Sequence, residues 1–197
     1  MSQKMFAEFI GTAILSLSVL LSVTVVDSVL ITPVLAALVL GLFVYSIGSI
    51  SGCHINPAVT LGLWSITKIS TNDAISYIIA QCLGALAAFG IVAATVGGVS
   101  LGLAAEDGTV FLAELIGTAL FTFGIASVVF GSVKDAASGL VIGGSLLLGI
   151  TLAVGLGAGG ILNPAVGIAL GSSSLSYVAG AIFGSVLGMQ VYRALIK

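Results

Sequence analysis

The stretch SGCHINPAVTLG (51–62) and its echo GGILNPAVGIALG (159–171) organise this 197-residue chain. Each contains the triplet Asn-Pro-Ala, and the two triplets use two of the three prolines. Asn is a preferred N-cap and Pro a preferred first residue of a helix, so each triplet predicts a helix start. The apolar residues that follow soon end, which predicts short helices of about 12–15 Å, roughly half of a 30 Å hydrocarbon core. Two such half-helices that meet tip to tip at the bilayer midplane would make one full-length span.

The composition is that of an integral membrane protein. Only 6% of the residues are charged and 59% are hydrophobic, whereas a soluble domain carries about 25% charged residues. Because apolar runs long enough to span a bilayer fill nearly the whole chain, we expect one all-α membrane domain over residues 1–197. Cys53 and Cys82 both lie in apolar surroundings, so no disulfide framework is implied. Apolar runs long enough to span a bilayer lie at about 5–26, 31–50, 74–96, 110–131, 138–157 and 175–196.

The two halves of the chain, about 1–103 and 107–197, repeat each other. AEFIGT at 7–12 matches AELIGT at 113–118 at an offset of 106, and Asn56 matches Asn163 at an offset of 107. Because three spans per half is an odd number, the second half must enter the membrane from the opposite side, so the repeats are inverted. Tyrosines and small residues also match at an offset of 100, as in the pairs Tyr77 with Tyr177, Gly84 with Gly184 and Ala88 with Gly188.

Two further patterns concern packing and orientation. Gly180, Gly184 and Gly188 form a row at helical spacing, which predicts close approach to a neighbouring helix. All basic residues fall on one side if both termini are cytoplasmic, and the acidic connectors fall on the other, which is the positive-inside pattern. We therefore expect both termini to be cytoplasmic, and we expect the protein to lie in the plasma membrane. The basic residues are Lys4, Lys68, Lys134, Arg193 and Lys197, and the acidic ones outside are Asp27, Glu106 and Asp107.

The asparagines are the main candidate site residues. An N-cap Asn accepts a backbone N–H with its side-chain oxygen, so its NH₂ donors point beyond the helix tip, where both helix dipoles also aim. A water molecule there accepts hydrogen bonds from two amides and finds no acceptor along the pathway, which breaks a proton wire. The alternative is that both asparagines only cap re-entrant turns. The site predicted on this basis comprises Asn56, Pro57, Ala58, Asn163, Pro164 and Ala165.

Other polar residues leave alternatives open. Glu8 and Glu114 are ionisable groups within spans, and either relay protons or accept N–H groups of the re-entrant loops. His54 is the only histidine, and is either a pH sensor at the cytoplasmic mouth or a hydrogen-bonded brace of its loop. Cys53 lies three residues before Asn56, as Gly160 does before Asn163, so we expect it to border the pathway; alternatively it is a small buried apolar residue.

The paired triplets, the AEF/AEL-IGT motifs and six spans in inverted halves resemble the aquaporin (major intrinsic protein) family, over nearly the whole chain. The resemblance implies a right-handed helical bundle, a homotetramer with one pore per subunit, and loop-bracing roles for the two glutamates. It also implies a lipid bilayer, water and small neutral solutes as partners, with no nucleic acid, no metal, no cofactor and no catalysed reaction.

The narrow part of the pore departs from the family pattern. Members usually place an aromatic, a His or small residue, a loop residue and an Arg at four positions. Counted back from the asparagines, these are Ala36, Thr151, Gly160 and Val166 here, with Leu40 and Leu147 facing the pore one turn deeper. Val after the second triplet occurs in some plant vacuolar members, and the Asp of typical glycerol facilitators is absent, because Gly167 and Ile168 stand there.

The sequence thus predicts a passive channel for water and small neutral solutes such as glycerol, ammonia or urea, closed to protons and ions. Three alternatives remain. The first is a secondary transporter, because inverted repeats with broken helices also describe that class. The second is a metalloid or ammonia channel with little water flux. The third is a junctional or scaffolding protein that keeps a closed pore fold.

Overall fold

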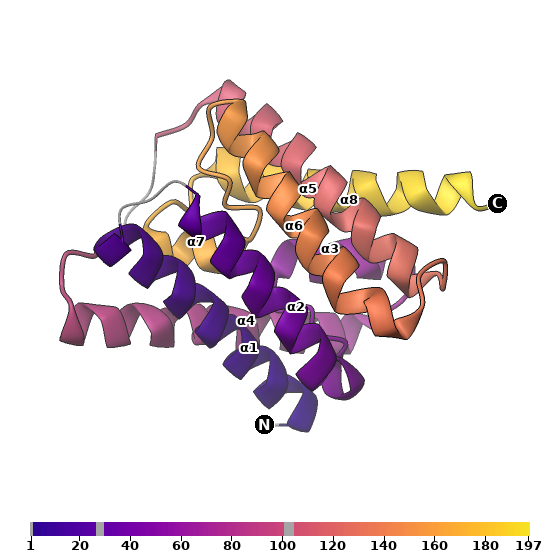
Figure 1. The fold of residues 1–197 in the computed structure, drawn as a ribbon, viewed down its shortest axis with the longest axis horizontal. Coiled ribbons are helices and arrows are strands. Elements are labelled where there is room, and N and C mark those ends of the chain that lie inside the picture. Colours follow the sequence, from indigo (N-terminus) through magenta and orange to yellow (C-terminus); the bar gives the residue numbers. More distant parts are fainter. Residues whose placement is uncertain (1, 27–29, 101–104) are drawn as a thin grey trace.

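The computed structural model describes residues 2–26, 30–100 and 105–197, and these residues form helices joined by short loops (Figure 1). Six of the helices are long and apolar enough to cross a membrane, which confirms the predicted spans. They are α1 (Gln3–Leu21, continued by a π-helical turn, Ser22–Val26), α2 (Ile31–Ser51), α4 (Thr71–Thr95), α5 (Gly108–Val129), α6 (Ser138–Gly155, preceded by a 3-10 turn, Asp135–Ala137) and α8 (Leu175–Leu195).

Two short helices complete the fold, and both begin at the proline of an Asn-Pro-Ala triplet. They are α3 (Pro57–Ser65) and α7 (Pro164–Leu170). The all-α fold of six spans and two half-helices expected from the sequence is confirmed. Asp27, which the sequence places on the non-cytoplasmic side, is not among the described residues.

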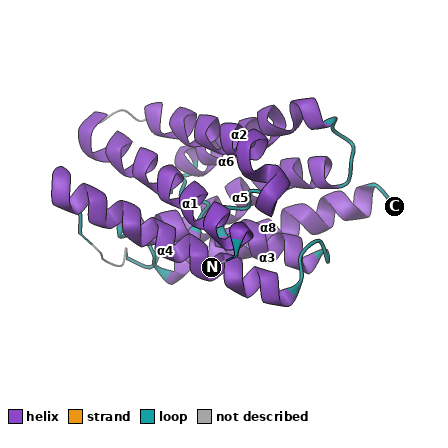
Figure 2. Ribbon diagram, turned by 90° about the horizontal axis from the view of Figure 1, so that it is seen from below, coloured by secondary structure: helices purple, strands orange, loops and turns teal. Residues whose placement is uncertain are grey.

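Corresponding helices of the two halves pack in corresponding pairs. In the first half α1 packs on α2 and α4, and in the second half α5 packs on α6 and α8. The halves interlock through α2 against α6, α3 against α8 and α7 against α4. In Figure 2, α2 and α6 run along one edge of the bundle and α4 and α3 along the other. This crossing of the half-helices onto the opposite half brings the two re-entrant loops together.

Glycines allow the long helices to approach closely. A Cβ atom on Gly180 would lie 2.7 Å from the carbonyl oxygen of Phe111 in α5. Cβ atoms on Gly184 and Gly188 would likewise collide with carbonyl oxygens of α5. A Cβ atom on Gly84 of α4 would collide with the backbone of α1. The predicted small-residue contact is therefore the α5–α8 seam, with its counterpart between α1 and α4.

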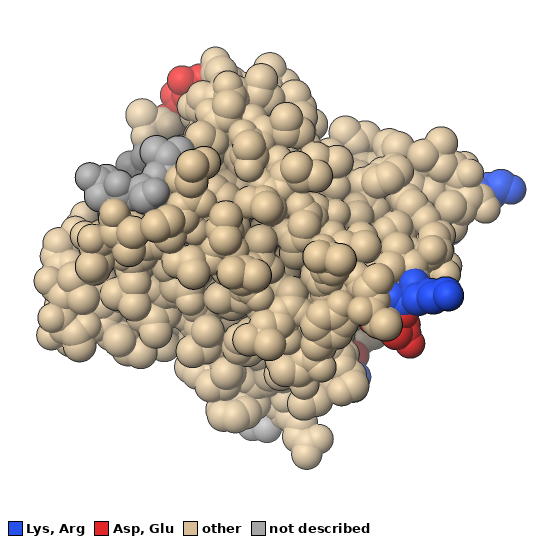
Figure 3. Space-filling view, viewed as in Figure 1, with Lys and Arg blue, Asp and Glu red and all other residues tan. Residues whose placement is uncertain are grey.

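Apart from Glu8 and Glu114, which are buried within α1 and α5, several charged residues lie at the ends of the bundle. Lys4, Lys68 and Asp135 border a cavity at one end of the bundle. Glu106 lies at the opposite end, just before α5, where it contacts the start of α8. On the face drawn in Figure 3 uncharged atoms cover almost the whole surface, and the visible Lys and Arg atoms lie toward one side. Apolar side chains such as Leu38 and Leu42 of α2 are about two-thirds exposed (64% and 65%), as expected of a surface that faces lipid.

Candidate transport pathway

Both half-helices are capped by their asparagines. The Asn56 Oδ1 atom accepts the N–H groups of Ala58 at 2.8 Å and Val59 at 3.4 Å. The Asn163 Oδ1 atom accepts those of Ala165 at 3.0 Å and Val166 at 3.4 Å. The N-cap geometry predicted from the sequence is confirmed, and it directs each NH₂ group away from its own helix.

Each NH₂ group then bonds the loop of the other half. Asn56 Nδ2 donates to the carbonyl oxygen of Leu162 at 2.9 Å, and Asn163 Nδ2 donates to that of Ile55 at 3.0 Å. Because an amide NH₂ carries two N–H groups, this cross-brace uses one per side chain. Both side chains also border a cavity, so the second N–H is available to a passing molecule. The sequence had not indicated this division of the two donors.

The loops before the asparagines turn with left-handed backbone. The φ angle is +53° at Cys53, +40° at Ile55 and +51° at Leu162. Such residues cost of order 1–3 kcal/mol each and persist only when their surroundings hold them in place. Here the N–H groups of Ile55 and Leu162 meet buried carboxyl groups, and that of Cys53 meets Ser51 Oγ at 3.1 Å.

Glu8 and Glu114 supply those carboxyl groups. Glu8 accepts the N–H groups of His54 at 2.9 Å and Ile55 at 2.6 Å. Glu114 accepts those of Ile161 at 2.9 Å and Leu162 at 2.7 Å. Both glutamates are fully buried (0% exposed), and neither lines the two cavities that lie along the line of the asparagines. The geometry therefore matches the bracing interpretation and leaves a proton relay without access to the pathway.

The first loop has further braces that sequence reasoning missed. Ser51 Oγ donates to Glu8 at 2.6 Å, and Gln81 Nε2 donates to Glu8 at 2.8 Å and to Thr60 at 3.0 Å. Thr60 also contacts the His54 ring Nδ1 at 3.2 Å. This contact matches the bracing interpretation of His54, which also borders the first cavity.

Two tyrosines hold the loops from matched positions. The Tyr77 hydroxyl donates to the carbonyl oxygen of Ser51 at 2.9 Å. The Tyr177 hydroxyl accepts the N–H of Gly159 at 3.1 Å. The repeat at an offset of 100 was the signal that these two residues share a role.

Two cavities lie along the line of the asparagines. The first, of about 300 Å³, is bordered by both asparagines, by α2 and α6, and by the second loop. The second, of about 770 Å³, lies at the end of the bundle that carries Lys4 and Lys68. Leu40, His54 and Phe121 border both. Phe121, on α5, was not among the residues selected from the sequence.

Most residues predicted for the pore border these cavities. Ala36, Gly160 and Val166 border the first cavity and Cys53 the second. Pro57, Ala58, Pro164 and Ala165 are buried behind the asparagines and border neither.

The prediction for α6 was wrong by one residue. Leu146 and Ile150 border the first cavity, whereas Leu147 is half-buried and borders neither cavity. Thr151 is exposed and bonds the carbonyl oxygen of Leu147 within its own helix. The positions on α6 had been counted back from Asn163, through the turn that follows Gly155. An error of one residue in such a count rotates the selected side chain by about 100° around the helix. The offset of 106 from Leu40 would have selected Leu146.

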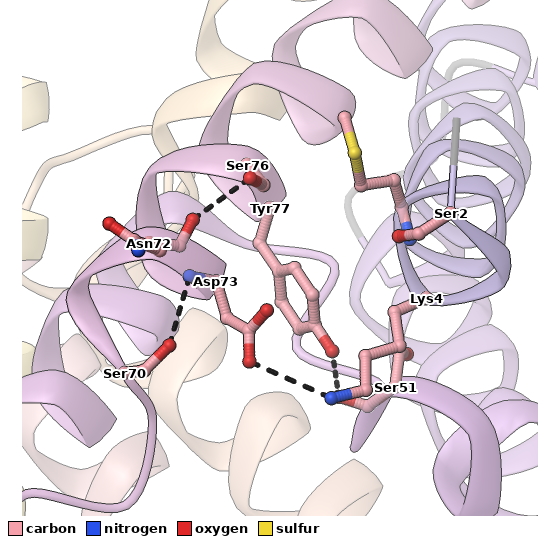
Figure 4. A network of polar contacts seen from close by, with 9 residues as sticks. Ser2, Lys4, Ser51, Ser70, Asn72, Asp73, Ser76 and Tyr77 are labelled. Carbon is pink, nitrogen blue, oxygen red and sulfur yellow. Dashed lines mark hydrogen bonds and ion pairs between the residues drawn. The ribbon is translucent and has the colours of Figure 1, made fainter.

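The mouth of the second cavity carries an ion pair. Figure 4 shows Lys4 Nζ facing Asp73, 3.6 Å apart, beside the Tyr77 ring. Ser70 Oγ caps the start of α4 by accepting the N–H of Asp73 at 3.1 Å. Lys68, another residue of this mouth, lies 4.7 Å from the centre of the Phe130 ring.

Comparison with known proteins agrees with this architecture. The family model described as "Major intrinsic protein" matches residues 1–192. Aquaporin AqpM of Methanothermobacter thermautotrophicus is 37% identical over 176 residues, which cover 77% of this chain and 71% of that protein. A glycerol uptake facilitator protein-like 6 of Lactiplantibacillus plantarum is 36% identical over 193 residues, covering 89% and 88%.

A solved structure supports the same fold. The X-ray structure of the aquaglyceroporin from Plasmodium falciparum superposes with a TM-score of 0.76 at 23% identity, covering 98% of this chain and 96% of that one. Helix order, the two capped half-helices and the sequence matches agree, and the chain therefore belongs to the major intrinsic protein family.

Proposed function

We propose that the chain is a passive membrane channel for water and small neutral solutes, including solutes of glycerol size. The observation that carries this is the pair of asparagine amides, each with one N–H group available on the wall of a cavity whose other side chains are mainly apolar. Donors along one side and an apolar wall opposite suit a small uncharged molecule that accepts hydrogen bonds. The names of the aquaporin and glycerol facilitator relatives point the same way.

The first cavity favours neutral solutes beyond water. Among its described lining residues none is Asp, Glu, Lys or Arg. Ala36, Gly160 and Val166, which stand at the expected narrow part of the pore, add little bulk and no charge. Because Glu8 and Glu114 are occupied by the loops, no titrating carboxylate borders this cavity to couple transport to an ion gradient. This argues against the secondary transporter.

The experiment is stopped-flow light scattering on proteoliposomes, run in parallel for water, glycerol, urea and ammonia. Val166→Arg places a charge and five donors at the wall. We expect water permeation to survive and glycerol permeation to fall by at least about tenfold, the lower range of pocket discrimination. Val166→Leu, which adds bulk without charge, is the matched control and should have the smaller effect. Equal glycerol flux in the wild type and in Val166→Arg would show that position 166 does not face the pathway.

We further propose a homotetramer in the plasma membrane with both termini cytoplasmic. The supports are the family, the wide apolar surface and the gathering of basic residues at the end of the second cavity. Native mass spectrometry should find four copies of the 19.5 kDa chain, and a C-terminal tag should be labelled only from the cytoplasmic face.

A further inference from the structure

We propose that the size limit on permeating solutes is set by a collar of Leu40, His54 and Phe121, and not by Ala36, Gly160 and Val166. This proposal deepens the proposed channel function and rests on it. The collar residues are the ones that border both cavities. Any solute that crosses from one cavity to the other must therefore pass between these three side chains.

The level of Ala36, Gly160 and Val166 lies within the first cavity. The same cavity reaches Val23 and Thr32 at the ends of their helices and, in the other direction, Asn56 and Leu40. It is thus continuous across the three small residues, and a solute that enters it has already passed them. The boundary between the cavities lies one helical turn further along α2, from Ala36 to Leu40.

The collar side chains are held in place. Phe121 and Leu40 are only 2% and 3% exposed and belong to the same buried apolar cluster. The His54 ring is bonded through Nδ1 to Thr60 and lies edge-on to Tyr77, with centroids 5.1 Å apart. Packed side chains of this kind yield little, so the collar discriminates by size.

The collar exists on one side of the asparagines only. The counterparts of Phe121 and Leu40 at the offset of 106 are Leu15 and Leu146, and the counterpart of His54 at the offset of 107 is Ile161. All three counterparts are aliphatic and border the first cavity alone. The two halves therefore differ at the positions that limit the size of a permeating solute, because the rings of Phe121 and His54 stand where the other half has the aliphatic side chains of Leu15 and Ile161.

The first test measures the size limit. Phe121→Ala and Leu40→Ala should raise the permeability ratio of xylitol to glycerol by at least about tenfold, since a methylene-sized change in an apolar pocket discriminates about 10–200-fold. Phe123→Ala removes a ring of the same helix that packs on Tyr192 instead, 5.0 Å between centroids, and should leave the ratio unchanged. Phe121→Leu, which copies the counterpart Leu15, gives an intermediate ratio and replaces Phe121→Ala if that variant does not fold.

Val166→Ala tests the rival position. If it raises the ratio while Phe121→Ala, Phe121→Leu and Leu40→Ala do not, the collar is overturned. If the collar variants raise the ratio and Val166→Ala does not, the collar holds.

The second test does not depend on transport. In a Cys82→Ser background, Cys53 reports the second cavity and Val166→Cys the first. Biotin maleimide added on the first-cavity side of uniformly oriented vesicles should label position 166 and leave Cys53 unlabelled, and adding Phe121→Ala should expose Cys53. Labelling of Cys53 with Phe121 intact would overturn the collar. An intact barrier in a protein that conducts none of the four solutes would instead refute the proposed channel function.

Discussion

Cys53 and Ile55 hold left-handed backbone, although neither is glycine. The loop adopts this conformation because its N–H groups then reach Glu8, which also gathers Ser51 and Gln81. A further consequence is that the Cys53 side chain borders the second cavity while remaining only 5% exposed. Cys82, on α4, borders neither cavity.

Mercury should therefore block the channel through Cys53. A mercuric ion is soft and binds thiolate strongly, and at position 53 it would narrow the second cavity next to the collar. We expect mercuric chloride to inhibit water flux into proteoliposomes, Cys53→Ser to abolish the inhibition and Cys82→Ser to leave it intact. Inhibition that follows Cys82 would mean that the first loop does not border the pathway.

The position of helix α8 depends on two sets of contacts, one along its length and one at its start. Along its length, Gly180, Gly184 and Gly188 admit the backbone of α5. At its start, the Ser174 side chain does not cap the helix. Instead Glu106, which precedes α5, accepts the N–H groups of Leu175 at 2.7 Å and Ser176 at 2.8 Å. An anion at a helix N-terminus is favourable because it faces the positive end of the dipole.

The seam predicts opposite effects for two helical glycines. In Gly188→Ala the new methyl group would collide with the carbonyl oxygen of Ala119, and such overpacking costs about 1–3 kcal/mol. In Gly90→Ala the methyl group meets no atom within 4 Å, and Ala is favoured over Gly in a helix by roughly 0.5–1 kcal/mol. Thermal unfolding in detergent should show a lower midpoint for Gly188→Ala and an equal or higher one for Gly90→Ala. A lower midpoint for Gly90→Ala as well would contradict the view that the close contact of α8 with α5 is what makes Gly188 necessary.

The cap of α8 predicts a dependence on pH. Hydrogen bonds from the Ser176 hydroxyl and from the N–H groups of Leu175 and Ser176 hold the pKa of Glu106 below its ordinary value of 4.5. Since the folded pKa is the lower one, the stabilisation is fully present above pH 4.5 and is lost as the pH falls through the folded pKa. The thermal midpoint of the wild type should therefore fall more steeply below pH 4.5 than that of Glu106→Gln. Parallel curves for the two proteins would contradict this role.

The two halves are joined at the centre of the bundle by their asparagines. Each half supplies one amide and one carbonyl oxygen to the other, through Asn56 with Leu162 and Asn163 with Ile55. The half-helices cross onto the opposite half in the same way, α3 onto α8 and α7 onto α4. The asparagines therefore act both on the permeating molecule and on the stability of the bundle.

Replacing both asparagines by Asp should affect both properties. A carboxylate can cap its helix but donates no hydrogen bond to the opposite carbonyl, and it attracts cations. We expect Asn56→Asp with Asn163→Asp to conduct protons and to lose about 1–3 kcal/mol of stability per site, the cost of a buried group left without its partner. Dissipation of a pH gradient in proteoliposomes and thermal unfolding measure the two effects.

Asn72→Asp, on the exposed first turn of α4, is the matched control and should change neither property. A wild-type protein that already dissipates the gradient through this pathway would refute the argument for proton exclusion.

Local patterns in the sequence were sufficient for the spans, the capped half-helices and the glycine seam. Asn-Pro at a helix start, an apolar run of about 20 residues and glycines four residues apart each act within one or two turns. The repeat of AEF-IGT also placed Glu8 and Glu114 at corresponding depths before their partners were known.

The pathway itself depends on contacts between residues far apart in the chain. Asn56 donates to a carbonyl 106 positions away, and Phe121 borders both cavities together with Leu40 and His54 of the other half. Which face of α6 borders the cavity was mispredicted because a turn of unknown length precedes Asn163, and each residue of error rotates the helix by about 100°. Rotation about a helix axis, and the choice of one amide N–H for the opposite loop, follow from the packing of the two halves against each other, because no pattern within either half specifies them.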